Sequence, residues 1–137
     1  MLTGVKEIDL DNMVNLPNVE ELYLGRMTDL SLIQKFSKLT NLQRLMITSD
    51  DESIPSAISL CKNLDFLILR NCEKIKELPI EINNLKKMKL IVLRNNFELT
   101  NANLKPAVLN KNLRIFLKNN QKLGEVENCK EHCVTNW

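Results

Sequence analysis

Aromatic residues are scarce in this chain, which has one Trp, one Tyr and four Phe among 137 residues. Apolar residues still make up 44% of the sequence, and most of them are Leu, Ile and Val. The length is sufficient for one domain with a core of its own. A composition rich in Leu and Asn with few aromatic residues indicates a periodic core rather than an irregular one.

Histidine and glycine are also rare, which limits the chemistry that the chain can support. A single histidine, His132, excludes a His-rich metal cluster and disfavours Cys–His and Ser–His–Asp catalytic sites. The three glycines, Gly4, Gly25 and Gly124, are too far apart for a phosphate-binding loop. We therefore expect a protein that is not an enzyme, with no cofactor and no small-molecule substrate.

Long apolar segments are missing as well, since no apolar run approaches the roughly 18 residues of a membrane span. The first residues, MLTGVKEIDLDN, lack the basic start and apolar stretch of a signal peptide. We therefore expect no membrane partner and a cytoplasmic location, with the nucleus as the alternative. In such a compartment the four cysteines, Cys61, Cys72, Cys129 and Cys133, are expected to be reduced thiols.

The segment CKEHC places three potential zinc ligands, Cys129, His132 and Cys133, close together. A structural zinc site normally has four ligands, and Cys61 and Cys72 are expected several turns away. We favour the interpretation that the two cysteines of this segment are small apolar residues on a capping helix, and we predict no metal site. Two alternatives stay open, which are a disulfide to a partner and a zinc ion shared with a partner.

A pattern of the form L-x-x-L-x-L-x-x-N/C recurs along the chain. Its middle apolar position falls at Ile8, Leu22, Leu45, Leu67, Ile91 and Ile115, in steps of 14, 23, 22, 24 and 24 residues. The alternation in each segment predicts a short strand with one buried face. The turn position lies three residues after the last apolar residue of each segment. It holds Cys72, Asn96 and Asn120 in the later segments, and Met13, Met27 and Asp50 in the earlier ones.

Between the strands the apolar spacing changes to three or four residues, as in Ile54, Ile58, Cys61 and Leu64. This spacing predicts a helical return, with Pro55 or Pro79 just before it. The chain resembles the leucine-rich-repeat family, in particular its L-P-x-x-I-x-x-L-x-x-L type. The resemblance implies an α/β fold: a curved solenoid of about five to six repeats, with a parallel β-sheet on the concave face and short helices or turns on the convex side.

We expect one leucine-rich-repeat domain over residues 1–137. Residues 1–18 would form a clipped first unit, 19–120 the repeat units and 121–137 a C-terminal cap. The candidate covering residues of that cap are Val126, Cys129, Cys133 and Trp137. Whether the chain is a whole protein or part of a longer repeat array stays open.

The residues between the apolar positions point away from the core. One outward column begins at Asp9 and is wholly apolar after it, at Tyr23, Met46, Ile68, Val92 and Phe116. An exposed apolar strip of this length usually marks an interaction site. The flanking charges run from acidic to basic, with Glu20 and Glu21 at one end and Arg70, Arg94 and Lys118 at the other.

Three functions fit these features. The leading hypothesis is a non-catalytic protein-binding module or adaptor that uses the concave apolar column, with the charged rim orienting the partner. The second is a component of a ribonucleoprotein particle, associated with the ribosome or the spliceosome, that contacts RNA phosphates through the Arg and Lys residues. It ranks second because the net charge of +2 is small and the sequence contains no RNA-binding motif. The third is a regulatory subunit that docks on an enzyme.

Overall fold

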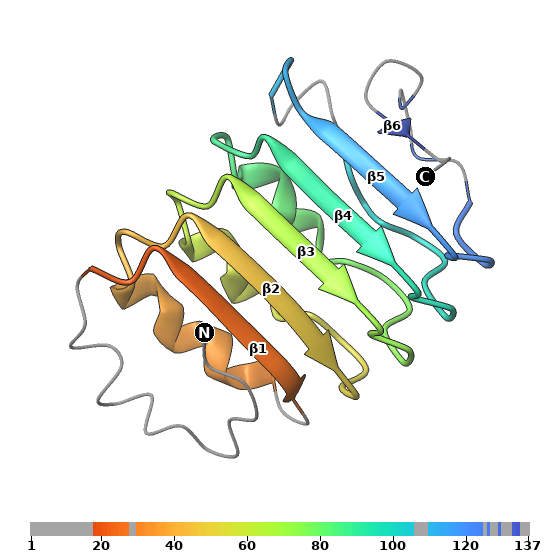
Figure 1. Ribbon diagram of the computed structural model, residues 1–137, viewed down its shortest axis with the longest axis horizontal. Helices are drawn as coiled ribbons and strands as arrows, with labels where there is room; N and C mark the ends of the chain where they lie inside the picture. Colours follow the sequence, from red (N-terminus) through yellow and green to blue (C-terminus); the bar gives the residue numbers. More distant parts are fainter. Residues whose placement is uncertain are drawn as a thin grey trace.

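The computed structural model describes residues 18–27, 30–105, 110–124, 126, 129 and 133–134. In these residues the strands are β1 (Glu21–Met27), β2 (Arg44–Ser49), β3 (Phe66–Arg70), β4 (Leu90–Arg94), β5 (Arg114–Lys118) and β6 (Cys133–Val134). They form one parallel sheet in which the spatial order follows the sequence (Figure 1). This is the leucine-rich-repeat solenoid that the repeat pattern predicts.

The strand register follows the predicted repeat. Leu22 is paired with Leu45, and the same column continues through Leu67, Ile91 and Ile115. Ile115 in the last repeat is paired with Ile91, which is the partner that the 24-residue step predicts. The proposed first unit around Ile8 lies outside the described residues.

Alternation explains why these segments are strands with one buried face. Leu45, Ile47, Leu67 and Leu69 are each at most 1% exposed, while the residues between them are only partly buried. Val, Ile and Leu side chains suit such a half-buried pleated surface. The buried column continues from repeat to repeat, so each turn of the solenoid completes the core of its neighbours.

Among the described residues, three 3-10 helices cover the buried face of the sheet (Figure 1): η1 (Leu30–Lys38), η2 (Ser56–Leu60) and η3 (Ile80–Asn84). Pro55 and Pro79 precede η2 and η3, where their missing N–H groups remove no helical hydrogen bond. Ile58 N and Ile82 N donate to the carbonyl groups of these prolines, each at 3.1 Å.

The predicted apolar stripe of the helical return is confirmed. Ile54, Ile58, Cys61 and Leu64 are all buried, and the next repeat buries its equivalent residues in the same way. The helical form is 3-10, whose rise of about 2.0 Å per residue brings the chain back to the sheet in few residues.

Asparagines shape the turns that follow β3, β4 and β5. Asn71, Asn95 and Asn119 have φ values of 55°, 57° and 56°, a left-handed conformation that Asn tolerates better than most residues. Their side chains also bond to one another, because Asn95 Nδ2 donates to Asn71 Oδ1 and Asn119 Nδ2 to Asn95 Oδ1, both at 2.8 Å.

The residues that follow Asn95 and Asn119, which are Asn96 and Asn120, connect neighbouring turns and are here called the asparagine ladder. Asn96 accepts a hydrogen bond from Cys72 N and donates to the carbonyl group of Leu69. Asn120 makes the equivalent bonds to Asn96 N and the carbonyl group of Leu93. Backbone groups that the strand pairing leaves unsatisfied are thereby satisfied.

The turn after β2 differs from the predicted one. Asp50 was expected in the buried turn position, but it is exposed, and Ser49 is buried there instead with 1% of its surface exposed. The register between β1 and β2 shifts after Leu24, so Met27 is paired with Ser49. The turn after β2 therefore begins one residue earlier than the repeat pattern predicts. Met13 lies outside the described residues.

The C-terminal segment adds β6 to the sheet beside β5, with Cys133 paired to Ile115. Cys129 and Cys133 form a disulfide, with their Cα atoms 5.1 Å apart, which is within the usual range for such a bond. The expectation of four reduced thiols is therefore wrong for this pair, whereas Cys61 and Cys72 are free and buried. Cys133 lies in a strand and not in the expected capping helix.

Val126, Cys129 and Cys133 pack against the hydrophobic core, as expected of covering residues. His132 and Trp137 lie outside the described residues. In the described part of the chain, no helix has the length and apolar character needed to span a bilayer.

Candidate interaction surface on the open face

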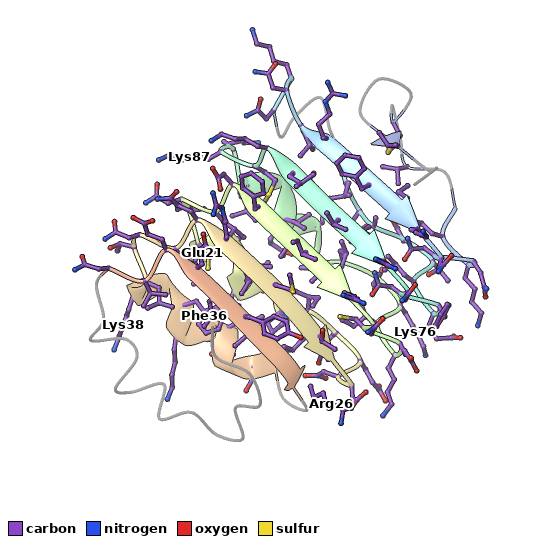
Figure 2. All side chains as sticks on the ribbon, viewed as in Figure 1. Glu21, Arg26, Phe36, Lys38, Lys76 and Lys87 are labelled. Carbon is purple, nitrogen blue, oxygen red and sulfur yellow. A yellow bond between two sulfur atoms is a disulfide. The ribbon has the colours of Figure 1, made fainter. Side chains whose placement is uncertain are left out.

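The face of the sheet that the 3-10 helices leave uncovered, here called the open face, is the face predicted to be concave. Its side chains lie along the strands in Figure 2. Because parallel strands place equivalent residues about 4.8 Å apart, these side chains form columns across the sheet. Three columns carry the features that the sequence singled out.

The central column contains the predicted apolar residues. Tyr23 is paired with Met46, and the column continues through Ile68, Val92 and Phe116. All five side chains are partly exposed. The apolar residues are therefore brought together as predicted, on a face where each of them keeps part of its surface exposed.

The neighbouring column adds two apolar residues that the sequence reasoning missed. Phe66 on β3 is paired with Leu90 on β4, and both are partly exposed. Together with Ile68 and Val92 they widen the apolar strip into a patch two columns across. The signal was present in the sequence, because the segments LDFLIL and MKLIVL are apolar at the outward positions on both sides of the middle residue.

Arg44 borders this patch on β2. Its guanidinium carbon lies 5.2 Å from the centre of the Phe66 ring, which is a cation–π contact. Arg44 is also paired with Glu21 on β1. The predicted acidic rim is thus partly neutralised at Glu21, while Glu20, just before β1, is exposed.

The third column, here called the cationic ladder, consists of Arg70, Arg94 and Lys118. The three residues are paired directly across β3, β4 and β5, as the repeat predicted. Arg70 and Arg94 are exposed. Within the described part of the chain, neither of these two arginines has an ion-pair partner. Like charges directly opposite each other are destabilising, so the ladder favours an external anion.

A polar hollow of about 540 Å³ lies where the strands begin, at the edge marked by Lys87 in Figure 2. Its lysines are already engaged. Lys89 forms a 2.8 Å ion pair with Asp65, Lys87 donates to Asn63 Oδ1, and Lys86 donates to a main-chain carbonyl group at 2.7 Å. Only Lys89 is paired with a carboxylate there, since Lys86 and Lys87 donate to neutral oxygens. The residues that line the hollow are all polar, so the open face with its apolar patch is the stronger candidate surface.

No metal centre supports a catalytic alternative in the described residues, where no three His, Cys, Asp or Glu side chains are grouped to hold an ion. The proposed zinc ligand His132 lies outside these residues, and Cys129 and Cys133 are paired with each other.

Comparisons with known proteins bear on the fold. No protein-family model matches the chain, and no curated protein does. Among solved structures the chain is similar to a leucine-rich-repeat protein of Leptospira interrogans, with 21% sequence identity and a TM-score of 0.42. The similarity covers 77% of this chain and 38% of the other, so the chain spans well under half of that protein.

Proposed function

We propose that the chain is a non-catalytic protein-binding module or adaptor, and that its partner docks on the open face. The apolar patch carries this proposal. Tyr23, Met46, Ile68, Val92 and Phe116 form an unbroken column of partly exposed apolar side chains. Burial of such a patch is favourable by about 25 cal/mol per Å² of apolar surface, which a partner can use for binding.

The architecture supports this proposal because a sheet of aligned columns is a rigid display surface. The asparagine ladder holds the strand ends and the 3-10 helices pack against the core behind the sheet, so the backbone of the open face needs little rearrangement on binding. We propose that the repeats belong to the L-P-x-x-I-x-x-L-x-x-L type, since Pro55 and Pro79 lead into equivalent buried stripes.

The test is affinity purification of the tagged protein from its native cell, with and without ribonuclease, followed by mass spectrometry. A variant with Met46→Ser, Ile68→Ser and Val92→Ser should lose partners that survive ribonuclease. The matched control is Leu60→Ser with Ile80→Ser, which removes apolar side chains that are 47% and 56% exposed on the helical side. Circular dichroism should show that both variants stay folded.

Equal recovery of the partners by the open-face variant and the control would contradict the proposed function. Loss of the same partners from both variants would point to a general effect of apolar loss rather than to the open face.

The cationic ladder favours a second candidate function, a component of a ribonucleoprotein particle. Arg70, Arg94 and Lys118 can contact phosphates, and binding of that kind weakens steeply as salt increases. Partners that disappear with ribonuclease would favour this candidate. A regulatory subunit that docks on an enzyme is a special case of the leading proposal, and a captured enzyme whose activity changes on binding would support it.

The proposed location is the cytoplasm, with the nucleus as the alternative. The buried free thiols Cys61 and Cys72 fit a reducing compartment, whereas the Cys129–Cys133 disulfide fits an oxidising one. Alkylation of the thiols in lysed cells, before and after reduction, would show the state of that pair and so test the location.

A further inference from the structure

We infer that the partner presents an acidic amphipathic helix, which lies across the strands of the open face with its carboxylates on the cationic ladder. This inference rests on the proposed function, and it adds the chemistry and the conformation of the binding segment. It follows from the spacing of the ladder, from the position of the apolar patch beside it, and from the distribution of charge.

The spacing of the ladder matches a helix better than an extended segment. Arg70, Arg94 and Lys118 lie on three adjacent strands, so the ends of the ladder are about 9.6 Å apart. Helical residues i, i+3 and i+7 share one face and rise about 10.5 Å from first to last. Three residues on one side of an extended segment span about 13 Å, which exceeds the ladder.

The apolar patch lies where the apolar stripe of that helix would be. Ile68 and Val92 precede Arg70 and Arg94 by two residues on their strands, which is a distance of about 6.6 Å. A helix is about 10 Å across, so one helix can cover both columns. The central column crosses four strand spacings, about 19 Å, which corresponds to about 13 helical residues.

The charges on the open face determine which side of the partner helix is acidic. Arg70 and Arg94 are exposed without ion-pair partners in the described part of the chain. Across the patch, the positive charge of Arg44 is already paired with Glu21. Arg114 on β5, in the same column as Arg44, is exposed as well. The ladder side still has two neighbouring arginines against one, so a carboxylate gains more there, and this difference sets how the helix is rotated about its axis.

The same column disfavours RNA as the occupant. Proteins that bind single-stranded RNA stack successive bases on aromatic side chains. The aromatic residues of the central column, Tyr23 and Phe116, are at its two ends, and the residues between them are Met46, Ile68 and Val92. Such a surface matches the apolar stripe of a helix.

A phage-displayed library of helical peptides tests this inference on the full chain. Each peptide has a fixed Leu stripe, helix-favouring Ala elsewhere, and randomised positions at i, i+3 and i+7 beside the stripe. Selection should enrich Glu and Asp at these three positions. Selection on a chain with Arg70→Glu and Arg94→Glu should enrich Lys and Arg at the same positions.

Affinities of one selected acidic peptide provide the quantitative test. Arg70→Gln with Arg94→Gln should weaken its binding by about 3- to 20-fold, the range expected for two exposed ion pairs. The matched control is Lys76→Gln, an exposed cation at the edge where the strands end (Figure 2), which should leave the affinity unchanged. Insertion of Pro in the middle of the peptide should abolish binding, because it breaks the helix.

The outcomes separate this inference from the proposed function. One outcome is peptides whose binding requires Met46, Ile68 and Val92 but shows no acidic preference; another is peptides that bind equally well with Pro. Either result overturns the inference and leaves the proposed function standing. Peptides that bind independently of those three residues contradict both. Binding of a fluorescent oligouridylate that needs the ladder but not the central column overturns the inference in favour of RNA.

Discussion

Asn120 Nδ2 donates a 2.9 Å hydrogen bond to the main-chain carbonyl group of Leu93, which lies in the preceding repeat. Asn96 repeats this contact one turn earlier, with the carbonyl group of Leu69 at 3.2 Å. The bonds connect turns that are distant in sequence and adjacent in space. They hold the strand ends in register, and the cationic ladder lies at those same strand ends.

Asn96→Ala is expected to destabilise the chain strongly. Asn96 is 1% exposed, and its side chain satisfies both Cys72 N and the carbonyl group of Leu69. Removing it leaves two buried backbone groups unpaired, and each such group costs about 1–3 kcal/mol. We expect a loss of about 2–4 kcal/mol in the free energy of unfolding, measured by urea titration.

The control for this prediction is Asn84→Ala at the end of η3, where the side chain is exposed. An exposed substitution of this kind usually changes the free energy of unfolding by less than about 0.5 kcal/mol. Equal stability of Asn96→Ala and Asn84→Ala would show that the asparagine ladder does not stabilise the turns.

Phe66→Ser is expected to weaken partner binding about as much as Ile68→Ser. Phe66 widens the apolar patch and holds Arg44 over its ring at 5.2 Å. The serine variant loses apolar contact area and frees Arg44 to move. Titration calorimetry with a partner, or with a peptide selected on the unmodified chain, should show a loss of about ten-fold or more, because buried aromatic residues commonly contribute over 1 kcal/mol to an interface.

Gln43→Ser is the matched control, since Gln43 is exposed near the start of β2 and outside the apolar patch. Its affinity should remain unchanged. If Phe66→Ser also left the affinity unchanged, the binding surface would be limited to the central column or would lie elsewhere.

The register of the sheet could be predicted because two periods agree. Alternation within a strand determines which residues are buried, such as Leu45 and Leu67. The 22- to 24-residue repeat determines which residues of neighbouring strands are paired. The central column and the ladder follow from these periods directly. What they bind stays a prediction, because columns on a face specify a surface and not its partner.

Local irregularities could not be predicted in this way. The shift between β1 and β2 moves Ser49 into the position expected for Asp50, and no period signals such a shift. The disulfide between Cys129 and Cys133 was missed for a different reason. The expectation of reduced thiols came from the compartment, whereas the pairing depends on the local distance between two residues of one short segment.

The stability of the protein is expected to fall between pH 9 and pH 11. Burial raises the pKa of both Cys61 and Cys72 from 9.0 to about 11 in the folded chain. Between these values the unfolded chain loses both thiol protons while the folded chain keeps them, so rising pH favours unfolding. Each thiol contributes a slope of up to about 1.4 kcal/mol per pH unit, and the contribution is fully present only below pH 9.

The variant Cys61→Ala with Cys72→Ala isolates this contribution, because all other titratable groups are the same in both proteins. The variant is expected to be less stable near neutral pH, since it loses two buried side chains, but its stability should fall less steeply above pH 9. Urea titrations at pH 8, 9, 10 and 11 provide the two slopes. Parallel slopes would mean that the thiols ionise equally in the folded and unfolded chains, which burial at 3% and 1% exposure argues against.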